Sequence, residues 1–265
     1  MEKMSQKTNI IELSKSEGVR MDDEWFDIAP LEHFWIQWRF QAFIHNKALS
    51  NLSDKRLFEI GCGHGMVMKQ FETLHNIVVD GCDLNPNALK LIEKGKGDIY
   101  LLNIYDEPPQ LLQKYDGILL MDVLEHIEND NEFLQTSCKY LQNEGLVIIN
   151  VPALNLLFSK YDRKMGHIRR YNKKIMRKLL KDNNIEVLGM EYWGFSLLPV
   201  VLIRKFFLLF INEENIVDTG FKLPGKFTNF VFKILMRIEI FLCKKPLIGA
   251  SLIAIGKYNV KNQNI

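Results

Sequence analysis

A short apolar segment that runs directly into three closely spaced glycines constrains the fold of this chain more than any other feature. The segment is Arg56-Leu-Phe-Glu-Ile-Gly-Cys-Gly-His-Gly65. Because glycine has no Cβ atom, the backbone can turn sharply there and a ligand can approach the main chain closely. The segment therefore predicts a buried strand that ends at a ligand-binding turn.

Runs with strand character alternate with helical patterns after this segment. We expect strands at 56–60, 77–82, 99–102, 117–121, 145–151, 185–192 and 250–256. Helical patterns lie between them at 66–73, 87–94, 131–141 and 173–182. Strands separated by helices favour a parallel sheet, and right-handed crossovers place the helices on both faces. The prediction is an α/β fold with a doubly wound, seven-stranded, mostly parallel sheet.

The chain divides into four expected segments. Residues 1–49, dense in aromatic side chains from position 24 onward, would form a helical N-terminal cover, and 50–193 the α/β domain. Residues 194–248 form an insertion of a length at which structureless loops are uncommon, so a helical cap is expected. Residues 249–265 would supply the last strand and a tail.

The spacing of the glycines argues against a nicotinamide-binding fingerprint. That fingerprint would place its third glycine at position 66, where this chain has Met66, and it does not usually carry an acid where Glu59 stands. A second acid, Asp83, ends the next expected strand, 18 residues after Gly65. Taken alone, an acid at a strand end is commonly a helix cap.

Together these residues resemble the motifs of class I S-adenosylmethionine-dependent methyltransferases, and the resemblance covers residues 50–155. It implies a Rossmann-like fold, S-adenosyl-L-methionine as cofactor and S-adenosyl-L-homocysteine as product. In that family the glycine loop lies under the methionine portion of the cofactor, and the acid after the second strand binds the ribose. The cofactor-binding residues that it implies are Glu59, Gly61, Cys62, Gly63, Gly65, Asp83, Leu84, Asn103, Ile104, Met121, Asp122 and Arg39.

Two of these assignments carry an alternative. The family usually has an aspartate near the adenine, whereas this chain has Asn103, and the alignment could place Asp106 there instead. Arg39 would reach the cofactor carboxylate, although a salt bridge to the α/β domain is the simpler interpretation.

A basic and aromatic segment follows the fifth expected strand and contains Gly166-His167-Ile-Arg169-Arg170-Tyr171. This pattern is similar to that of a bacterial subgroup of these methyltransferases. His167 is the candidate general base, because its ordinary pKa lies near neutrality, with loop ordering as the alternative. Arg169 and Arg170 could bind a carboxylate or phosphate, or be solvated charges. The substrate-binding set that we expect is Trp35, Arg169, Arg170 and Tyr171.

No metal site is expected from the spacing of His33, His64 and His126, and the four cysteines form no Cys-x-x-Cys pair.

The charge is unevenly divided between the two halves of the chain. Residues 1–150 hold 14 Lys and Arg against 24 Asp and Glu, whereas residues 151–265 hold 20 against 8. An acidic half suits a cationic cofactor, and a basic half suits an anionic partner. Nucleic acid is the partner we expect least.

The insertion combines apolar residues at helical spacing with lysines and arginines. Its apolar runs, 197–203 and 206–211, are too short to cross a bilayer. A core or homodimer helix is the favoured interpretation, and a basic amphipathic surface at 196–245 that contacts a membrane is the alternative. Since Met1–Leu13 lacks a secretory signal, we expect a cytoplasmic protein, either free or peripheral on the inner membrane face.

The predicted function is transfer of a methyl group from S-adenosylmethionine to an O, N or C atom of a small-molecule, sugar or lipid-linked acceptor. The sequence does not identify the acceptor, because this scaffold serves many chemistries. One alternative is a protein that binds S-adenosylmethionine or a membrane surface without turnover. A NAD-dependent oxidoreductase is the other.

Overall fold

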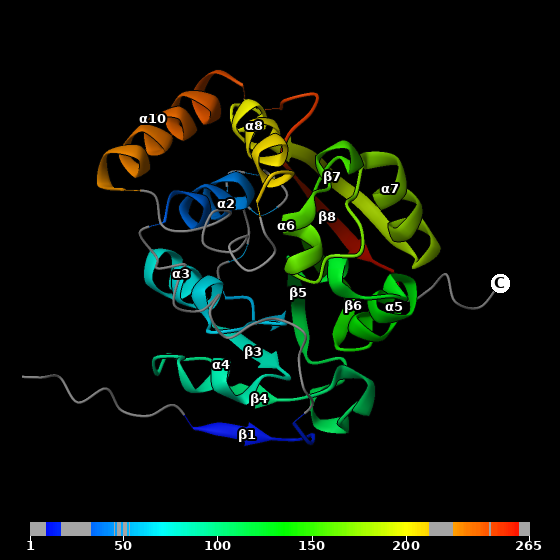
Figure 1. Cartoon of the computed structure of the whole chain (residues 1–265). Coiled ribbons are helices and arrows are strands. Elements are labelled where there is room, and N and C mark those ends of the chain that lie inside the picture. Colours follow the sequence, from blue (N-terminus) through cyan, green and yellow to red (C-terminus); the bar gives the residue numbers. More distant parts are fainter. Residues whose placement is uncertain are drawn as a thin grey trace, which may run out of the picture.

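The structure is a computed structural model that describes residues 9–16, 33–44, 46, 49, 52, 54–211, 225–243 and 245–259. Its centre is an eight-stranded sheet in the order β1-β4-β3-β2-β5-β6-β8-β7 (Figure 1). The strands are β1 (Ile10–Glu12), β2 (Leu57–Ile60), β3 (Val79–Asp83), β4 (Ile99–Leu101), β5 (Tyr115–Met121), β6 (Leu141–Pro152), β7 (Ile185–Trp193) and β8 (Ser251–Tyr258). Only the two pairings made by β8 are antiparallel. The predicted mostly parallel α/β sheet is confirmed.

The prediction of seven strands was wrong, because β1 adds an eighth strand at one edge. Ile10–Glu12 pairs in parallel with Ile99–Leu101, and Leu13 N and Ser14 N then donate to Leu101 O. Three residues are too few to show the alternation of a strand, and the exposed edge of β4 supplies the backbone partners that stabilise them. This strand comes from the segment in which we expected only a helical cover.

Helices cover both faces of the sheet (Figure 1). Successive residues of a strand point to opposite faces, so Ile118 belongs to one hydrophobic core and Leu119 to the other. The first core includes side chains of α5 and α7, and the second includes side chains of α2, α3 and α10. The bounds are α2 (Phe34–Ile44), α3 (Met66–His75), α4 (Pro86–Lys90), α5 (Asp130–Cys138), α6 (Lys160–Lys164), α7 (Lys173–Asp182), α8 (Leu198–Leu208) and α10 (Lys226–Leu242). Four short 3-10 helices are η2 (Ile104–Asp106), η3 (Pro109–Leu111), η4 (Leu124–His126) and η5 (Asn155–Leu157).

The order of the strands places a crevice between β2 and β5. From β2 the chain continues to β3 and β4 on one side, whereas β5 and β6 extend the sheet on the other side. At such a switch point the loops after the two central strands diverge, and ligands of open α/β sheets bind there. The loops in question are the glycine loop after β2 and the segment that begins at Asp122 after β5.

Helices α2, α8 and α10 lie together at the upper end of the molecule in Figure 1. Phe34 of α2 packs on Phe232 of α10 with 4.6 Å between ring centroids. The buried carboxylate of Glu239 in α10 accepts the backbone N–H groups of Gly194, Phe195 and Ser196, at 2.8, 3.0 and 2.7 Å. These bonds fix the turn from β7 into α8, so α8 is held over the crevice.

Candidate active site

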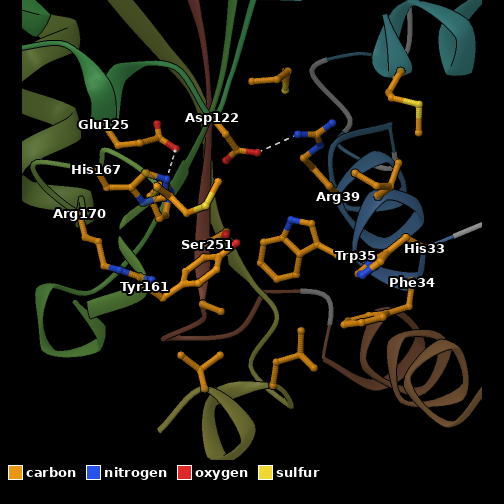
Figure 2. A pocket seen from close by; sticks show the side chains of 18 of the residues that line it. His33, Phe34, Trp35, Arg39, Asp122, Glu125, Tyr161, His167, Arg170 and Ser251 are labelled. Carbon is orange, nitrogen blue, oxygen red and sulfur yellow. Dashed lines mark hydrogen bonds and ion pairs between the residues drawn. The ribbon is translucent and has the colours of Figure 1, made fainter. Parts of the chain in front are cut away.

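A cavity of about 680 Å³ opens at the crevice between β2 and β5. The glycine loop and the start of the loop after β5 form its first wall, and residues of α6 and of the segment that follows it form the second. Residues of α2 and α8 complete the wall, and Figure 2 shows Trp35 and Arg39 of α2 on the side opposite His167. Ten of the predicted site residues line it: Trp35, Arg39, Glu59, Gly61, Cys62, Gly63, Met121, Asp122, His167 and Arg170.

The glycine loop has the backbone conformation for which its glycines are needed. Gly61 has a φ of 76° and Gly63 a φ of 52°, a left-handed region that other residues rarely adopt. A Cβ atom on Gly61 would lie 2.7 Å from a methyl carbon of Val123, so the loop also approaches the segment after β5 closely. The bare backbone therefore faces the cavity.

Asp83 ties the glycine loop to the end of β3. Its Oδ2 accepts the N–H of Gly63 at 2.8 Å and its Oδ1 accepts that of Asn85 at 2.9 Å. Burial raises the pKa of Asp83, and the backbone hydrogen bonds only partly offset it. A carboxylate has about four acceptor sites, so Asp83 can accept a hydrogen bond from a ligand in addition to these backbone bonds.

Five of the residues predicted to bind the cofactor lie outside this cavity. Gly65, Leu84, Asn103 and Ile104 do not line it, and neither does Asp83 itself. Asn103 caps η2 through its Oδ1, which accepts the N–H of Tyr105. The cavity thus covers only one end of the predicted cofactor site.

Glu59 lies in the cavity wall with 2% of its surface exposed. Burial raises its pKa to about 8, although Arg39 and a backbone N–H group of Met68 act to lower it. Its Oε2 receives no hydrogen bond from the described residues. A buried carboxyl group with an unused acceptor suits a cationic ligand group.

The raised pKa makes the stability of the protein depend on pH. In the unfolded chain the pKa of Glu59 is near 4.5, so between about 4.5 and 8 the folded state holds the proton more tightly. The free energy of unfolding should therefore fall as the pH rises through this window, by about 1 kcal/mol per pH unit from this group. We expect Glu59→Gln to gain stability relative to the wild type from pH 5 to pH 8, measured by urea unfolding. Glu144→Gln, at an exposed position, is the control, and equal pH dependence of all three proteins would refute the prediction.

Asp122 joins the α/β domain to α2 at the carboxyl end of β5. Its Oδ2 accepts Arg39 Nη1 at 2.8 Å, and its Oδ1 accepts Asn150 Nδ2 at 2.6 Å. The φ of Asp122 is 60°, an unfavourable conformation that these two bonds hold in place. The simpler of the two interpretations of Arg39, a salt bridge to the domain, is therefore present, and its contact with a cofactor stays a prediction. The Nε of Arg39 donates to no described residue.

His167 lies at the wall opposite Arg39 (Figure 2), and the buried carboxylate of Asp162 holds it. Its Nδ1 is 3.2 Å from Asp162 Oδ1, an oxygen that also accepts Arg170 Nε at 2.7 Å. Burial acts to raise the pKa of Asp162, but the hydrogen bonds and charges of His167 and Arg170 outweigh it and hold the pKa at about 2. A permanently ionised Asp162 orients the imidazole ring and leaves Nε2 directed to the cavity.

Two further side chains, to which the sequence assigned no role, stand beside His167. Its Nε2 is 4.0 Å from Oε1 of the fully buried Glu125, and its ring lies edge-on to His126 with 4.7 Å between centroids. Burial and the neighbouring His167 lower the pKa of His126 to about 4. Burial and the charge of Asp122 raise the pKa of Glu125 well above its ordinary range.

Arg169 and Tyr171 do not line the cavity, and their side chains bind Asp130 instead. Arg169 forms an ion pair with Asp130 at 2.9 Å, and the Tyr171 hydroxyl donates to Asp130 Oδ2 at 2.8 Å. Arg170 lines the cavity but is committed to Asp162 and to the carbonyl of Ala153. Of the expected substrate-binding residues, Trp35 and Arg170 are therefore the two that reach the cavity.

Helix α8 closes the cavity with apolar side chains that sequence reasoning placed only in a cap. Val200, Val201 and Phe207 line the cavity, together with Arg204, whose guanidinium lies 4.7 Å over the ring of Tyr161. Their convergence on the loop after β2 depends on the packing of distant segments, and no local pattern signals it. The second half of the cavity is thus an apolar chamber with cationic side chains at its edge.

Comparison with known proteins identifies relatives in one family. The family model described as "Methyltransferase domain" matches residues 33–189, which is more than half of the chain. A ubiquinone biosynthesis O-methyltransferase of Shewanella sp. is 23% identical over 163 residues, covering 58% of this chain and 67% of the relative. Its counterpart in Bradyrhizobium sp. is 33% identical over 112 residues, covering 41% and 44%. The chain spans about half to two thirds of the length of these relatives.

Solved structures show the same fold at low identity. A SAM-dependent methyltransferase from Archaeoglobus fulgidus has a TM-score of 0.52 and 14% identity, over 84% of this chain and 98% of that one. Phosphoethanolamine N-methyltransferase 2 of Haemonchus contortus, in complex with S-adenosyl-L-methionine, has a TM-score of 0.55 and 13% identity, over 86% and 56%. The predicted Rossmann-like methyltransferase fold is confirmed.

Proposed function

Because this chain belongs to the methyltransferase-domain family, whose enzymes use S-adenosylmethionine, we propose that it methylates a hydroxyl oxygen of an acceptor with an apolar body. The observation that carries the proposal is that the glycine loop, the Asp162–His167 pair and the apolar face of α8 meet at one cavity.

The residues at the glycine loop fit the methionine end of this cofactor. That end carries an ammonium and a carboxylate group, and the cavity offers an unpartnered buried acceptor at Glu59 Oε2 and an unpartnered buried donor at Arg39 Nε among the described residues. Asp83 has lone pairs for the ribose hydroxyls at the other end. S-adenosylmethionine supplies a methyl group on a cationic sulfur, which an acceptor atom displaces.

The chain contributes mainly by positioning, since the donor is already activated. Helix α2 and the glycine loop hold one side of the cavity, and α8 excludes water from the other side. His167, oriented by Asp162, is the group that we propose to take the acceptor proton at Nε2. The proton leaves the acceptor oxygen as that oxygen bonds to the methyl carbon, and the carbon–sulfur bond breaks.

An oxygen acceptor is supported by the names of the relatives, which are O-methyltransferases, and by the imidazole beside the cavity. An apolar body is supported by Val200, Val201 and Phe207 of α8. Arg204 at the edge of the same chamber suits an anionic substituent on the acceptor.

Formation of S-adenosylhomocysteine tests this function. The purified protein would be incubated with S-adenosylmethionine and, separately, with alkyl-substituted phenols and catechols, long-chain alcohols, and the corresponding amines. We expect product with hydroxylated apolar compounds. Binding of S-adenosylmethionine without product in any mixture would favour a non-catalytic binding protein, and product with the amines alone would contradict the oxygen acceptor.

A surface contact with a membrane is the second part of this proposal. Several large apolar side chains are exposed on α8, on α10 and at Phe210, which follows α8. They include Phe206, Phe227, Phe230 and Phe241. Patches of this kind mark interaction sites. No helix within the described parts of the chain is both long and apolar enough to cross a membrane.

The charge of these helices favours an anionic lipid surface over a second copy of the chain. Lys205, Lys226, Lys233 and Arg237 lie on α8 and α10, whose one acidic residue, Glu239, is buried and bonded to backbone N–H groups. A basic face repels its own copy but attracts anionic headgroups. Because Val200 and Phe207 are exposed and also line the cavity, the cavity opens on this face.

We expect the double variant Phe210→Ser, Phe241→Ser to bind vesicles of phosphatidylcholine and phosphatidylglycerol at least about 10-fold more weakly than the wild type, because each phenyl ring loses its apolar transfer energy. Sedimentation with vesicles measures this affinity. Leu74→Ser, at an exposed position of α3, is the control. Equal sedimentation of all three proteins, or a wild-type dimer that the double variant dissociates, would contradict the membrane contact.

A further inference from the structure

We propose that Glu125, His126 and His167 bind one divalent metal ion in the acceptor half of the cavity. The proposal rests on the proposed function, because the ion would act on the acceptor hydroxyl. One ligand atom from each of the three residues lies within 4.8 Å of the others. Two atoms that share an ion at about 2.1 Å each lie at most about 4.2 Å apart, so small side-chain rotations close the set.

Glu125 gives the first independent support. Its side chain is fully buried in the cavity wall, and neither carboxylate oxygen receives a hydrogen bond from the described residues. A buried carboxyl group without donors is costly in a folded protein. A cation at this position supplies the missing partner.

The outer partners of the two histidines give the second support. His167 is held through Nδ1 by Asp162, which Arg170 and Ser159 fix in turn. His126 is hydrogen-bonded to the backbone of Gly166. In metal sites one ring nitrogen of a histidine usually bonds to a carboxylate or backbone carbonyl while the other binds the ion. His167 has this arrangement, with Nδ1 on Asp162 and Nε2 on the side of Glu125, and the bond to Gly166 gives His126 a backbone partner of the same kind.

Backbone contacts hold the two halves of the set in register. Ile168 N donates to Glu125 O at 2.9 Å, and the Tyr171 hydroxyl, which donates to Asp130, also lies 3.1 Å from Leu124 O. The segment that carries His167 is thereby fixed against η4. His167 is far from Glu125 and His126 in the sequence, so the spacing of the histidines led us to expect no metal site. The metal site proposed here replaces that expectation.

Two imidazoles and one carboxylate select a transition-metal ion such as Zn²⁺ or Mn²⁺ over Ca²⁺, and three protein ligands leave positions open toward the cavity. An acceptor hydroxyl at an open position would lose its proton to water more readily. Its oxygen then bonds to the methyl carbon while the carbon–sulfur bond breaks, and the metal keeps its oxidation state. In this arrangement Nε2 of His167 is a ligand, and water takes the acceptor proton in place of the imidazole.

Direct metal binding tests the proposal without reference to activity. Chelator-treated, dialysed protein would be titrated with Co²⁺ and followed by its visible absorption, and with Zn²⁺ by calorimetry. We expect one ion per chain. Glu125→Gln, His126→Ala and His167→Ala should each weaken binding at least about 10-fold, and His75→Ala, at an exposed position of α3, should not.

Affinity for S-adenosylhomocysteine is measured on every variant, since the cofactor end of the cavity contains none of the three residues. Retained cofactor affinity shows that a variant is folded. If the wild type binds Co²⁺ and Zn²⁺ no more tightly than the three variants, the metal site is refuted, and His167 remains the proposed base. If the wild type itself does not bind S-adenosylhomocysteine, the proposed function is refuted instead.

Discussion

Asp83→Ala is expected to weaken the binding of S-adenosylhomocysteine at least about 100-fold. In the proposed complex the carboxylate accepts hydrogen bonds from both ribose hydroxyls. Each hydrogen bond to a charged group contributes about 1.5–3 kcal/mol, and 1.4 kcal/mol is tenfold in affinity. The variant also releases the N–H of Gly63, which Asp83 holds at 2.8 Å, so the glycine loop loses its anchor to β3.

Isothermal titration calorimetry measures this affinity, and Asp116→Ala is the matched control. Asp116 also accepts a backbone N–H through its carboxylate, that of Arg56 at 2.9 Å, but at the amino end of β5, away from the crevice. We expect the control to lose stability and to keep its affinity. Equal affinity of Asp83→Ala and the wild type would show that the nucleoside does not bind at the end of β3.

His167→Ala is expected to lower kcat at least about 100-fold and to leave the affinity for S-adenosylhomocysteine within about threefold of the wild type. A positioned acid or base contributes about 100-fold to 10,000-fold to a reaction rate. The loss is expected whether Nε2 takes the proton itself or binds the proposed ion. The cofactor affinity is spared because His167 stands on the wall formed by the segment after α6, opposite Arg39 of α2 (Figure 2).

Initial rates of S-adenosylhomocysteine formation, with whichever hydroxylated compound serves as acceptor, measure this effect. His75→Ala is the control, because His75 is an exposed histidine at the end of α3, outside the cavity. A His167→Ala enzyme with an undiminished kcat would show that the contact between Asp162 and His167 only orders the loop.

The backbone geometry of the proposed cofactor end was predictable from the sequence because its determinants are local. Gly61 and Gly63 adopt positive φ values within the loop after β2, and Asp83 ends the adjacent strand. Parallel neighbouring strands end at the same edge of a sheet, so the spacing of a strand, a turn and an acid predicts that the turn and the acid lie close together. The alternation of strands and helices likewise encodes the sheet.

The acceptor end was not predictable, because it is assembled from segments that are distant in the chain. Glu125 and His126 follow β5, His167 follows α6, and Val201 lies on α8. Their proximity depends on bonds such as Ile168 N to Glu125 O and on the anchoring of the α8 turn by Glu239. Strand β1 escaped prediction for a related reason, since its three residues are stabilised by the edge of β4 rather than by their own pattern.

The most direct test of the account is the rate of methyl transfer by Val201→Trp. Val201 lines the apolar chamber from α8, and the larger side chain would fill the acceptor half of the cavity while leaving the glycine loop untouched. We predict that the variant binds S-adenosylhomocysteine as the wild type does but forms it from S-adenosylmethionine at least about 10-fold more slowly with every active acceptor. A variant that keeps both the affinity and the full rate would show that the acceptor binds elsewhere.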